Sequence, residues 1–139
     1  MYAQDPTADN SAFDQYYRPV QTVVYMLVYQ LGGLSPFPFH LANVLLHCLA
    51  TILLYLLCVE LGLDRLIALM AAALFAVHPV HTEAVTWIAG VGDLACASFY
   101  FAALVTFLKF LKSNADKWLW ISSACFLAMC CVGYNTRRR

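Results

Sequence analysis

The sequence predicts an all-α fold, a polytopic membrane helix bundle with about four transmembrane helices and one interfacial helix. The first reason is composition, because 63% of the 139 residues are hydrophobic and only 12% are charged, with a mean hydropathy of +0.70. A soluble domain is roughly half apolar and about a quarter charged. The second reason is that the apolar residues gather in long runs, separated by short polar or Pro- and Gly-rich connections. The net charge of +0 gives no indication of nucleic-acid binding.

The chain begins with a polar stretch followed by a short apolar one. Residues 1–19 predict a water-exposed arm, and they lack the basic and then apolar layout of a signal peptide. Pro19 suits the first turn of a helix, and residues 20–31 are mainly apolar. At about 12 residues this helix is too short to cross a bilayer, which takes roughly 20, so we expect it to be interfacial.

Four later apolar runs predict membrane spans. They lie at residues 39–61, 66–78, 93–111 and 117–133, and a basic tail follows at 134–139. The second run is only about 18 Å long at 1.5 Å per residue, so it needs flanking residues or neighbouring helices to cross. Pro79 is expected to end or kink this second helix.

The distribution of Lys and Arg predicts which loops face the cytoplasm, since short cytoplasmic loops carry an excess of both. The basic residues of the internal loops fall on one side of the predicted bundle: Arg65, Lys109, Lys112 and Lys117. The N-terminal arm and the loop at 78–92 fall on the other side, with Arg18 alone. We therefore place the arm and this loop on the non-cytoplasmic side, although the Arg triplet at 137–139 points the other way.

The most informative polar stretch is residues 78–83 (HPVHTE), which lies between two predicted spans. Ionisable side chains near a bilayer are costly unless they face protein, water or a ligand, so they indicate a functional site. His78, His81 and Glu83 are therefore candidate substrate-binding residues. A metal site is not favoured, because the spacing differs from HExxH and Pro79 breaks the helical face. For Glu83, a structural role in the first turn of a short helix stays open.

Three further polar residues, His40, Asn43 and His47, recur at spacings of three and four, which places them on one face of the first span. Two interpretations stay open. The stripe is either a polar seam that hydrogen-bonds to neighbouring helices or the lining of a ligand cavity. We keep His40 and His47 as candidate substrate-binding residues.

Asp93 and Arg18 complete the candidate substrate-binding residues. Asp93 opens the third span, where an acidic residue is either a helix-start feature or a substrate contact. Arg18 adjoins Pro19 at the membrane surface, which suits either paired hydrogen bonds to a phosphate or anchoring on a lipid headgroup. The six cysteines lie in apolar runs and are expected to pack as small hydrophobes. We expect no metal or cofactor and assign no catalytic residue.

Three motifs occur in one order, at residues 16–19 (YYRP), 36–47 (PFPFHLANVLLH) and 74–85 (LFAVHPVHTEAV). Together they closely resemble the transmembrane and tetratricopeptide repeat-containing protein family and its bacterial relatives, over roughly residues 4–112. The resemblance implies part of a GT-C membrane glycosyltransferase fold. It also implies a polyprenyl- or dolichyl-phosphate-linked sugar donor, from which mannose or a similar sugar passes to protein Ser or Thr. Membrane lipids are the expected surroundings.

The chain departs from the family pattern in three places. The family's acidic pair, expected to supply the catalytic carboxylate, matches none of Asp5, Asp9 and Asp14. The family's Gly-Arg-x-Asp segment reads GVGD at residues 90–93 and so lacks the Arg. The Lys-Glu pair and the tetratricopeptide repeats expected after the last span do not follow it.

These departures lead us to expect a partial glycosyltransferase, truncated at both ends and inactive as an isolated polypeptide. The main alternative is a non-enzymatic membrane structural or assembly protein, whose polar residues only join helices. A small transporter is less favoured, because transporters commonly have paired halves and the sequence has no internal repeat.

Overall fold

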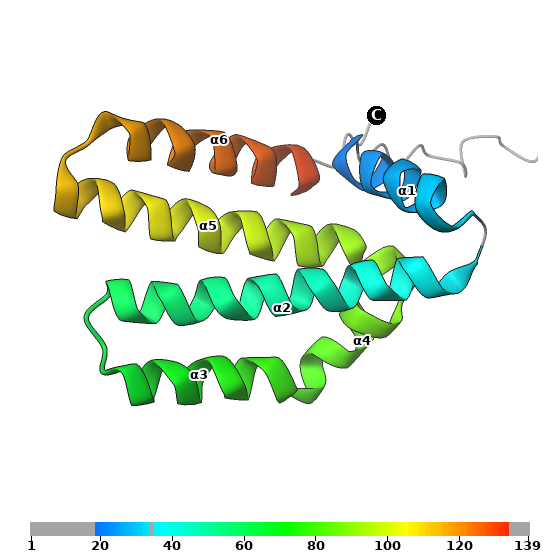
Figure 1. Ribbon diagram of the computed structural model, residues 1–139, viewed down its shortest axis with the longest axis horizontal. Helices are drawn as coiled ribbons and strands as arrows, with labels where there is room; N and C mark the ends of the chain where they lie inside the picture. The colour runs from blue at the N-terminus through cyan, green and yellow to red at the C-terminus, as the bar shows by residue number, and fades with distance from the viewer. Residues whose placement is uncertain (1–18, 34, 134–139) are drawn as a thin grey trace, which may run out of the picture.

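The computed structural model describes residues 19–33 and 35–133, and helices account for nearly all of them. Four long helices lie side by side, as Figure 1 shows. Their order across the molecule is α3 (Arg65–Val77), α2 (Pro36–Glu60), α5 (Val91–Ser113) and α6 (Asp116–Gly133). The remaining long element, α1 (Pro19–Gly32), lies beyond the C-terminal end of α6.

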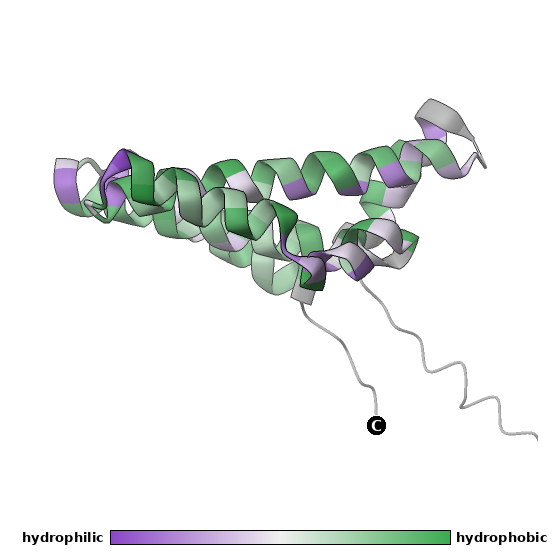
Figure 2. Cartoon of the chain, turned by 90° about the horizontal axis from the view of Figure 1, so that it is seen from below, coloured by the Kyte–Doolittle hydropathy of each residue, from purple (hydrophilic) through white to green (hydrophobic). Residues whose placement is uncertain are grey.

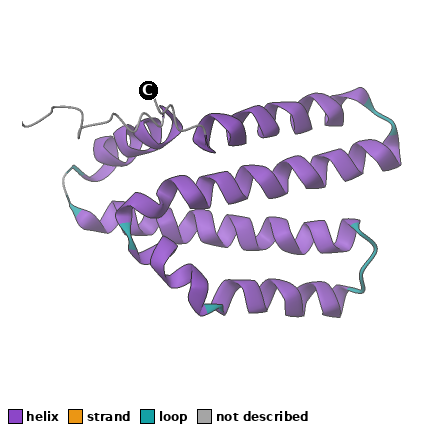
Figure 3. Cartoon of the chain, turned by 180° about the vertical axis from the view of Figure 1, so that it is seen from behind, coloured by secondary structure: helices purple, strands orange, loops and turns teal. Residues whose placement is uncertain are grey.

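Three short elements connect α3 to α5: η2 (Pro79–His81), α4 (Thr82–Thr86) and η3 (Ile88–Gly90). Only short loops join the helices, and the described residues contain no strand (Figure 3). The predicted all-α fold is confirmed. The predictions for the arm at 1–19 and the tail at 134–139 fall outside the described residues, apart from Pro19 in α1.

Two helices, α2 and α5, are long and apolar enough to cross a membrane, and they correspond to the predicted spans 39–61 and 93–111. α3 passes the same criterion only together with Pro79–Thr86, from which it is bent by 47°. α6, the counterpart of the predicted span 117–133, does not pass, and it begins with the charged residues Asp116 and Lys117. The described residues thus hold two or three candidate spans where the sequence predicts about four, and the membrane helix bundle is confirmed.

Local sequence explains where several helices begin and end. Pro36 stands at the start of α2, where a missing N–H costs no hydrogen bond. The Asp64 carboxylate caps α3 by accepting a hydrogen bond from the Leu66 N–H at 3.1 Å. Gly62 after α2 and Asn114 after α5 have positive φ angles of 88° and 51°, the left-handed conformation that ends many helices.

The helices bury small side chains against one another and direct many large ones outward. Ala50 and Ala68 are completely buried, whereas Phe37, Leu66 and Trp120 are strongly exposed. Small residues at helix crossings let backbones approach closely, which is how membrane helices pack. Figure 2 shows hydrophobic residues along the long helices. Such outward apolar faces suit helices that are surrounded by lipid or by further helices.

The turn end of the bundle, where α2 meets α3 and α5 meets α6, is held by an ion pair. Lys112 Nζ lies 2.7 Å from Glu60 Oε2 and donates to the Glu60 backbone oxygen at 2.6 Å. A cation at the C-terminus of α2 is also favoured by the helix dipole. Because the Lys112 side chain is 57% exposed, the pair contributes at most about 1 kcal/mol. It nevertheless ties α5 to α2.

At the opposite end, one buried polar side chain fixes the connecting segment to α2. Asn43 is completely buried, and its Nδ2 donates to the backbone oxygens of Trp87 at 2.9 Å and Val85 at 3.2 Å. Both oxygens lie at the C-terminal end of α4, where carbonyls lack partners inside the helix. Ser98 adds a hydrogen bond from α5 to α2, between its Oγ and the Leu46 oxygen at 3.3 Å. Asn43 therefore acts as part of a helix-joining seam.

The connecting segment folds back closely on itself at Gly90. This residue is buried, and a Cβ built on it would overlap the backbone oxygen of Ala84. A residue without a Cβ is therefore needed for η3 to lie this close to α4. Asn43 therefore holds the connecting segment against α2, and Gly90 lets η3 pack closely on α4.

The role of Asn43 predicts a large effect of Asn43→Asp, which keeps the size but sets a carboxylate against two carbonyl oxygens. We expect the free energy of unfolding of the 139-residue chain to fall by roughly 3 kcal/mol or more. Thr51→Val on the same helix removes only a hydrogen bond to the His47 oxygen within α2, and it should cost less than about 1 kcal/mol. Chemical unfolding in detergent micelles compares the two. Equal losses would contradict the role of Asn43.

The close approach at Gly90 predicts that the same substitution has different effects at two glycines. Gly90→Ala forces the backbones of α4 and η3 apart and should destabilise the chain by roughly 2–4 kcal/mol. Gly62→Ala meets no atom within 4 Å and should cost only about 1–2 kcal/mol, the cost of its left-handed conformation. Thermal unfolding checks this order. If Gly62→Ala proves the more harmful, Gly90 is not a tight contact.

Candidate functional site

A cluster of four rings lies where α2, the end of α3 and η2 meet. This histidine cluster consists of His47, Phe75, His78 and His81. The His81 ring centroid is 4.3 Å from that of Phe75, 5.3 Å from that of His47 and 6.1 Å from that of His78. The rings of His47 and Phe75 stack at 5.5 Å with an angle of 23° between their planes. Residues from two separate stretches of sequence thus form one site.

Pro79 is the local cause of this arrangement. It has no N–H and disfavours a helical conformation at the residue before it, so α3 ends at Val77 and His78 is extended, with φ −66° and ψ 128°. A tight turn follows, in which the His81 N–H donates to the His78 oxygen at 3.1 Å and Thr82 Oγ1 donates to the Pro79 oxygen at 2.6 Å. The predicted break at Pro79 is confirmed, and the turn brings His81 back toward Phe75.

His47 joins α2 to the end of α3. Its Nε2 lies 3.1 Å from the backbone oxygen of Ala76, and since a carbonyl oxygen can only accept, Nε2 carries the proton. The Nδ1 atom is buried and has no hydrogen-bond partner within the part of the chain that the structure describes. His47 is thus held by the fold through one nitrogen.

The other candidate residues lie outside the histidine cluster. His40 is exposed on α2, two turns before His47. Glu83 is exposed in the first turn of α4, where a carboxylate favours helix formation. Asp93 is exposed in the first turn of α5 and lines a separate hollow of about 390 Å³ with Cys96 and Tyr100. Arg18 lies outside the described residues. The binding roles of all seven candidates stay predictions.

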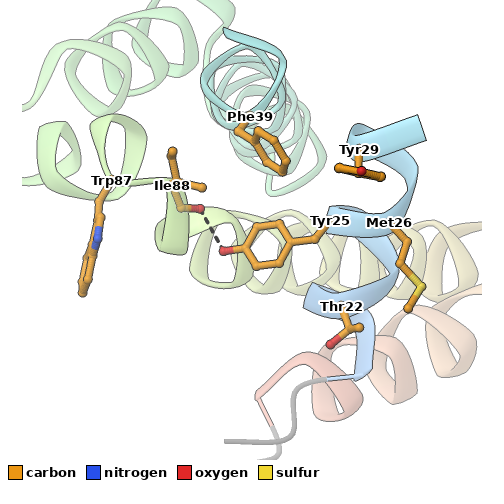
Figure 4. A pocket seen from close by; sticks show the side chains of 7 residues that line it. All are labelled: Thr22, Tyr25, Met26, Tyr29, Phe39, Trp87 and Ile88. Atoms are coloured by element: carbon orange, nitrogen blue, oxygen red, sulfur yellow. Dashed lines mark hydrogen bonds between the residues drawn. The ribbon is translucent and has the colours of Figure 1, made fainter. Parts of the chain in front are cut away.

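A second hollow of about 570 Å³ lies between α1, the start of α2 and the residues that follow α4 (Figure 4). Its lining is mostly aromatic and apolar: Thr22, Tyr25, Met26, Tyr29, Phe39, Trp87 and Ile88. The Tyr25 hydroxyl donates to the Ile88 oxygen at 3.1 Å, and the Tyr25 ring meets Phe39 edge-on at 5.9 Å. These contacts fasten α1 to the same connecting segment that Asn43 holds from α2.

Sequence reasoning missed two features of this region. Phe75, whose ring packs against those of His47 and His81, lies within the motif at 74–85, but nothing in the sequence distinguishes it from the apolar residues around it. The aromatic hollow was also missed, since Tyr25, Tyr29 and Trp87 fit an interfacial aromatic belt equally well. Within residues 19–33 and 35–133, no group of three or more His, Cys, Asp or Glu side chains could hold a metal ion. All six cysteines are free thiols.

Comparison with known proteins places these residues in a family context. The family model described as dolichyl-phosphate-mannose-protein mannosyltransferase matches residues 18–137. The chain is 39% identical over 124 residues to Protein O-mannosyl-transferase tmtc2 of Xenopus laevis, which covers 87% of this chain and 15% of that protein. It is 40% identical over 109 residues to Protein O-mannosyl-transferase Tmtc1 of Drosophila melanogaster, covering 78% of this chain and 13% of that protein.

A human protein O-mannosyl-transferase is similar to the chain to the same degree. The chain is 42% identical over 108 residues to Protein O-mannosyl-transferase TMTC1 of Homo sapiens, covering 76% of this chain and 12% of that protein. No solved structure matches the chain significantly. The chain thus spans only 12–15% of the length of these three relatives, but the family model covers most of the chain, including the histidine cluster. The chain therefore belongs to the dolichyl-phosphate-mannose-protein mannosyltransferase family and is a relative of its transmembrane and tetratricopeptide repeat-containing members.

Proposed function

We propose that this chain forms part of a membrane mannosyltransferase, one that moves mannose from a dolichyl- or polyprenyl-phosphate donor to Ser or Thr of a protein. The observation that carries the proposal is the histidine cluster. The family match includes its residues, and the fold gathers His47, His78 and His81 at the bend where α3 ends. The cluster would form part of the wall of the donor site.

The chemistry of such a transfer fits these side chains. An acceptor hydroxyl displaces a lipid phosphate from the anomeric carbon of the sugar, so a base must take the hydroxyl proton and polar groups must stabilise the departing phosphate. We assign His78, His81 and Arg18 to the phosphate. His40, His47, Glu83 and Asp93 would line the surrounding cavity. None of these residues is assigned as the base, and we expect the isolated chain to transfer no sugar.

We further propose that the connecting segment at 78–90 and the N-terminal arm face the non-cytoplasmic side. Support comes from the basic residues, since Arg65, Lys109, Lys112 and Lys117 lie in or beside the α2–α3 and α5–α6 turns. In Figure 1 both turns lie at one end of the bundle, and α4 lies toward the other. Positive charge at one end of a membrane bundle is typical of the cytoplasmic side.

Grafting this chain into the Homo sapiens relative, in place of the matching residues, tests the proposed function. In that chimera we expect His78→Ala and His81→Ala each to lower the kcat for mannose transfer from dolichyl-phosphate mannose by about 100-fold, as loss of a hydrogen bond to the leaving group does in other enzymes. Ser123→Ala is the control, because Ser123 is exposed and its hydroxyl donates to the Leu119 oxygen within α6.

Membrane abundance of each variant separates a chemical role from a structural one. Normal abundance with lost transfer supports the enzyme proposal. Full transfer by both histidine variants would overturn the assignment of the cluster to the donor site. Loss of the protein from the membrane in both variants, with transfer per molecule unchanged, would favour the alternative in which these residues only join helices.

A further inference from the structure

The turn at His78 fixes which ring nitrogen of this residue can meet a ligand. Because Pro79 has no N–H, the first backbone donor of the turn is the Val80 N–H. The extended backbone of His78 carries its imidazole over that donor, and His78 Nδ1 accepts the Val80 N–H at 3.2 Å. Asn and Asp side chains cap turns in the same way, by accepting from the backbone two residues on.

This hydrogen bond determines the tautomer of His78. An N–H group can only donate, so Nδ1 must hold a lone pair and the ring proton must be on Nε2. A doubly protonated ring would carry a proton on Nδ1 as well and would lose the bond to Val80. With Nδ1 accepting from Val80, the N–H of the neutral ring is Nε2–H, and it belongs to an exposed residue.

The other two rings of the cluster are placed differently. His47 uses its Nε2–H on the Ala76 oxygen. His81 is less exposed than His78 and lies among the rings of Phe75, His47 and His78. Within the cluster, His78 is thus the exposed histidine whose ring is oriented by a backbone hydrogen bond.

We infer that His78 binds the donor phosphate as a neutral hydrogen-bond donor, through Nε2–H to a phosphate oxygen, and acts neither as a cation nor as a base. This inference rests on the proposed function, because the phosphate is that of the polyprenyl donor. A neutral donor still forms a strong bond to an anionic oxygen, since one partner is charged. It would stabilise the phosphate both before and after the sugar leaves.

The tautomer is tested first, without any donor. The 139-residue chain, labelled with ¹⁵N-histidine in phosphatidylcholine nanodiscs, is studied by NMR near neutral pH, and the His78 signals are assigned by their absence in His78→Asn. We expect one protonated nitrogen at Nε2 and one bare nitrogen at Nδ1. A proton on Nδ1, in either the other tautomer or the cation, would overturn the inference, whether or not the chimera transfers mannose.

The phosphate contact is tested next, by adding dolichyl phosphate or, as the control lipid, dolichol. Dolichyl phosphate should shift the Nε2 signal and leave the Nδ1 signal nearly unchanged, whereas dolichol should shift neither. If the tautomer is as stated but dolichyl phosphate has no effect on Nε2, the phosphate assignment is wrong, even where the chimera still transfers mannose.

A pair of substitutions separates the two nitrogens of the ring. His78→Asn retains an acceptor near the position of Nδ1 and so keeps the turn, but it lacks the outer donor. His78→Gln places an amide N–H near the position of Nε2 and loses the hydrogen bond from the Val80 N–H. Dolichyl phosphate should bind to His78→Asn about 10- to 100-fold more weakly than to the native chain, and His78→Gln should retain more of the affinity. The reverse order would contradict an Nε2–H contact.

Discussion

The contact between Asn43 and the backbone oxygens of Val85 and Trp87 is the constraint on which the rest of this structure depends. In an apolar surrounding, a free carbonyl is costly because neither water nor lipid replaces its partner. The side-chain amide of Asn43 therefore fixes the position of the segment that follows α3. Once that segment rests on α2, His47 reaches Ala76 one turn further along, and α1 gains a partner through Tyr25 and Ile88.

The polar residues of the bundle consequently fall into two groups, those that donate hydrogen bonds to backbone oxygens and His78, which accepts one from a backbone N–H. Asn43 and His47 use donors on backbone oxygens and hold helices together, although both lie on the stripe that also suits a cavity lining. His78 accepts from the Val80 N–H through Nδ1 and is an exposed residue. The seam thus holds the segment that carries His78 against α2.

The helices and the break at Pro79 could be predicted from the sequence, because apolar run length, Pro and Gly act locally. The pairing of His47 with His81 could be anticipated only in part. The spacing from His40 to His47 gives the face of α2, but it does not give the bend of 47° that turns His81 toward that face. The packing of Phe75 against the His47 ring and the close approach of Gly90 to Ala84 depend on how segments fold back on one another, which no local pattern encodes. The span count differs because α3 is short and bent and α6 starts with charged residues.

The proposed dolichyl-phosphate site includes the histidine cluster, held on α2 through Asn43. The most direct measurement is photolabelling of the 139-residue chain in phosphatidylcholine vesicles, using a dolichyl phosphate with a photoreactive group next to the phosphate. Mass spectrometry then locates the labelled residues. We expect labels within residues 75–83, reduced by an excess of unlabelled dolichyl phosphate but not by dolichol. Labels confined to α6, or spread equally over all helices, would contradict it.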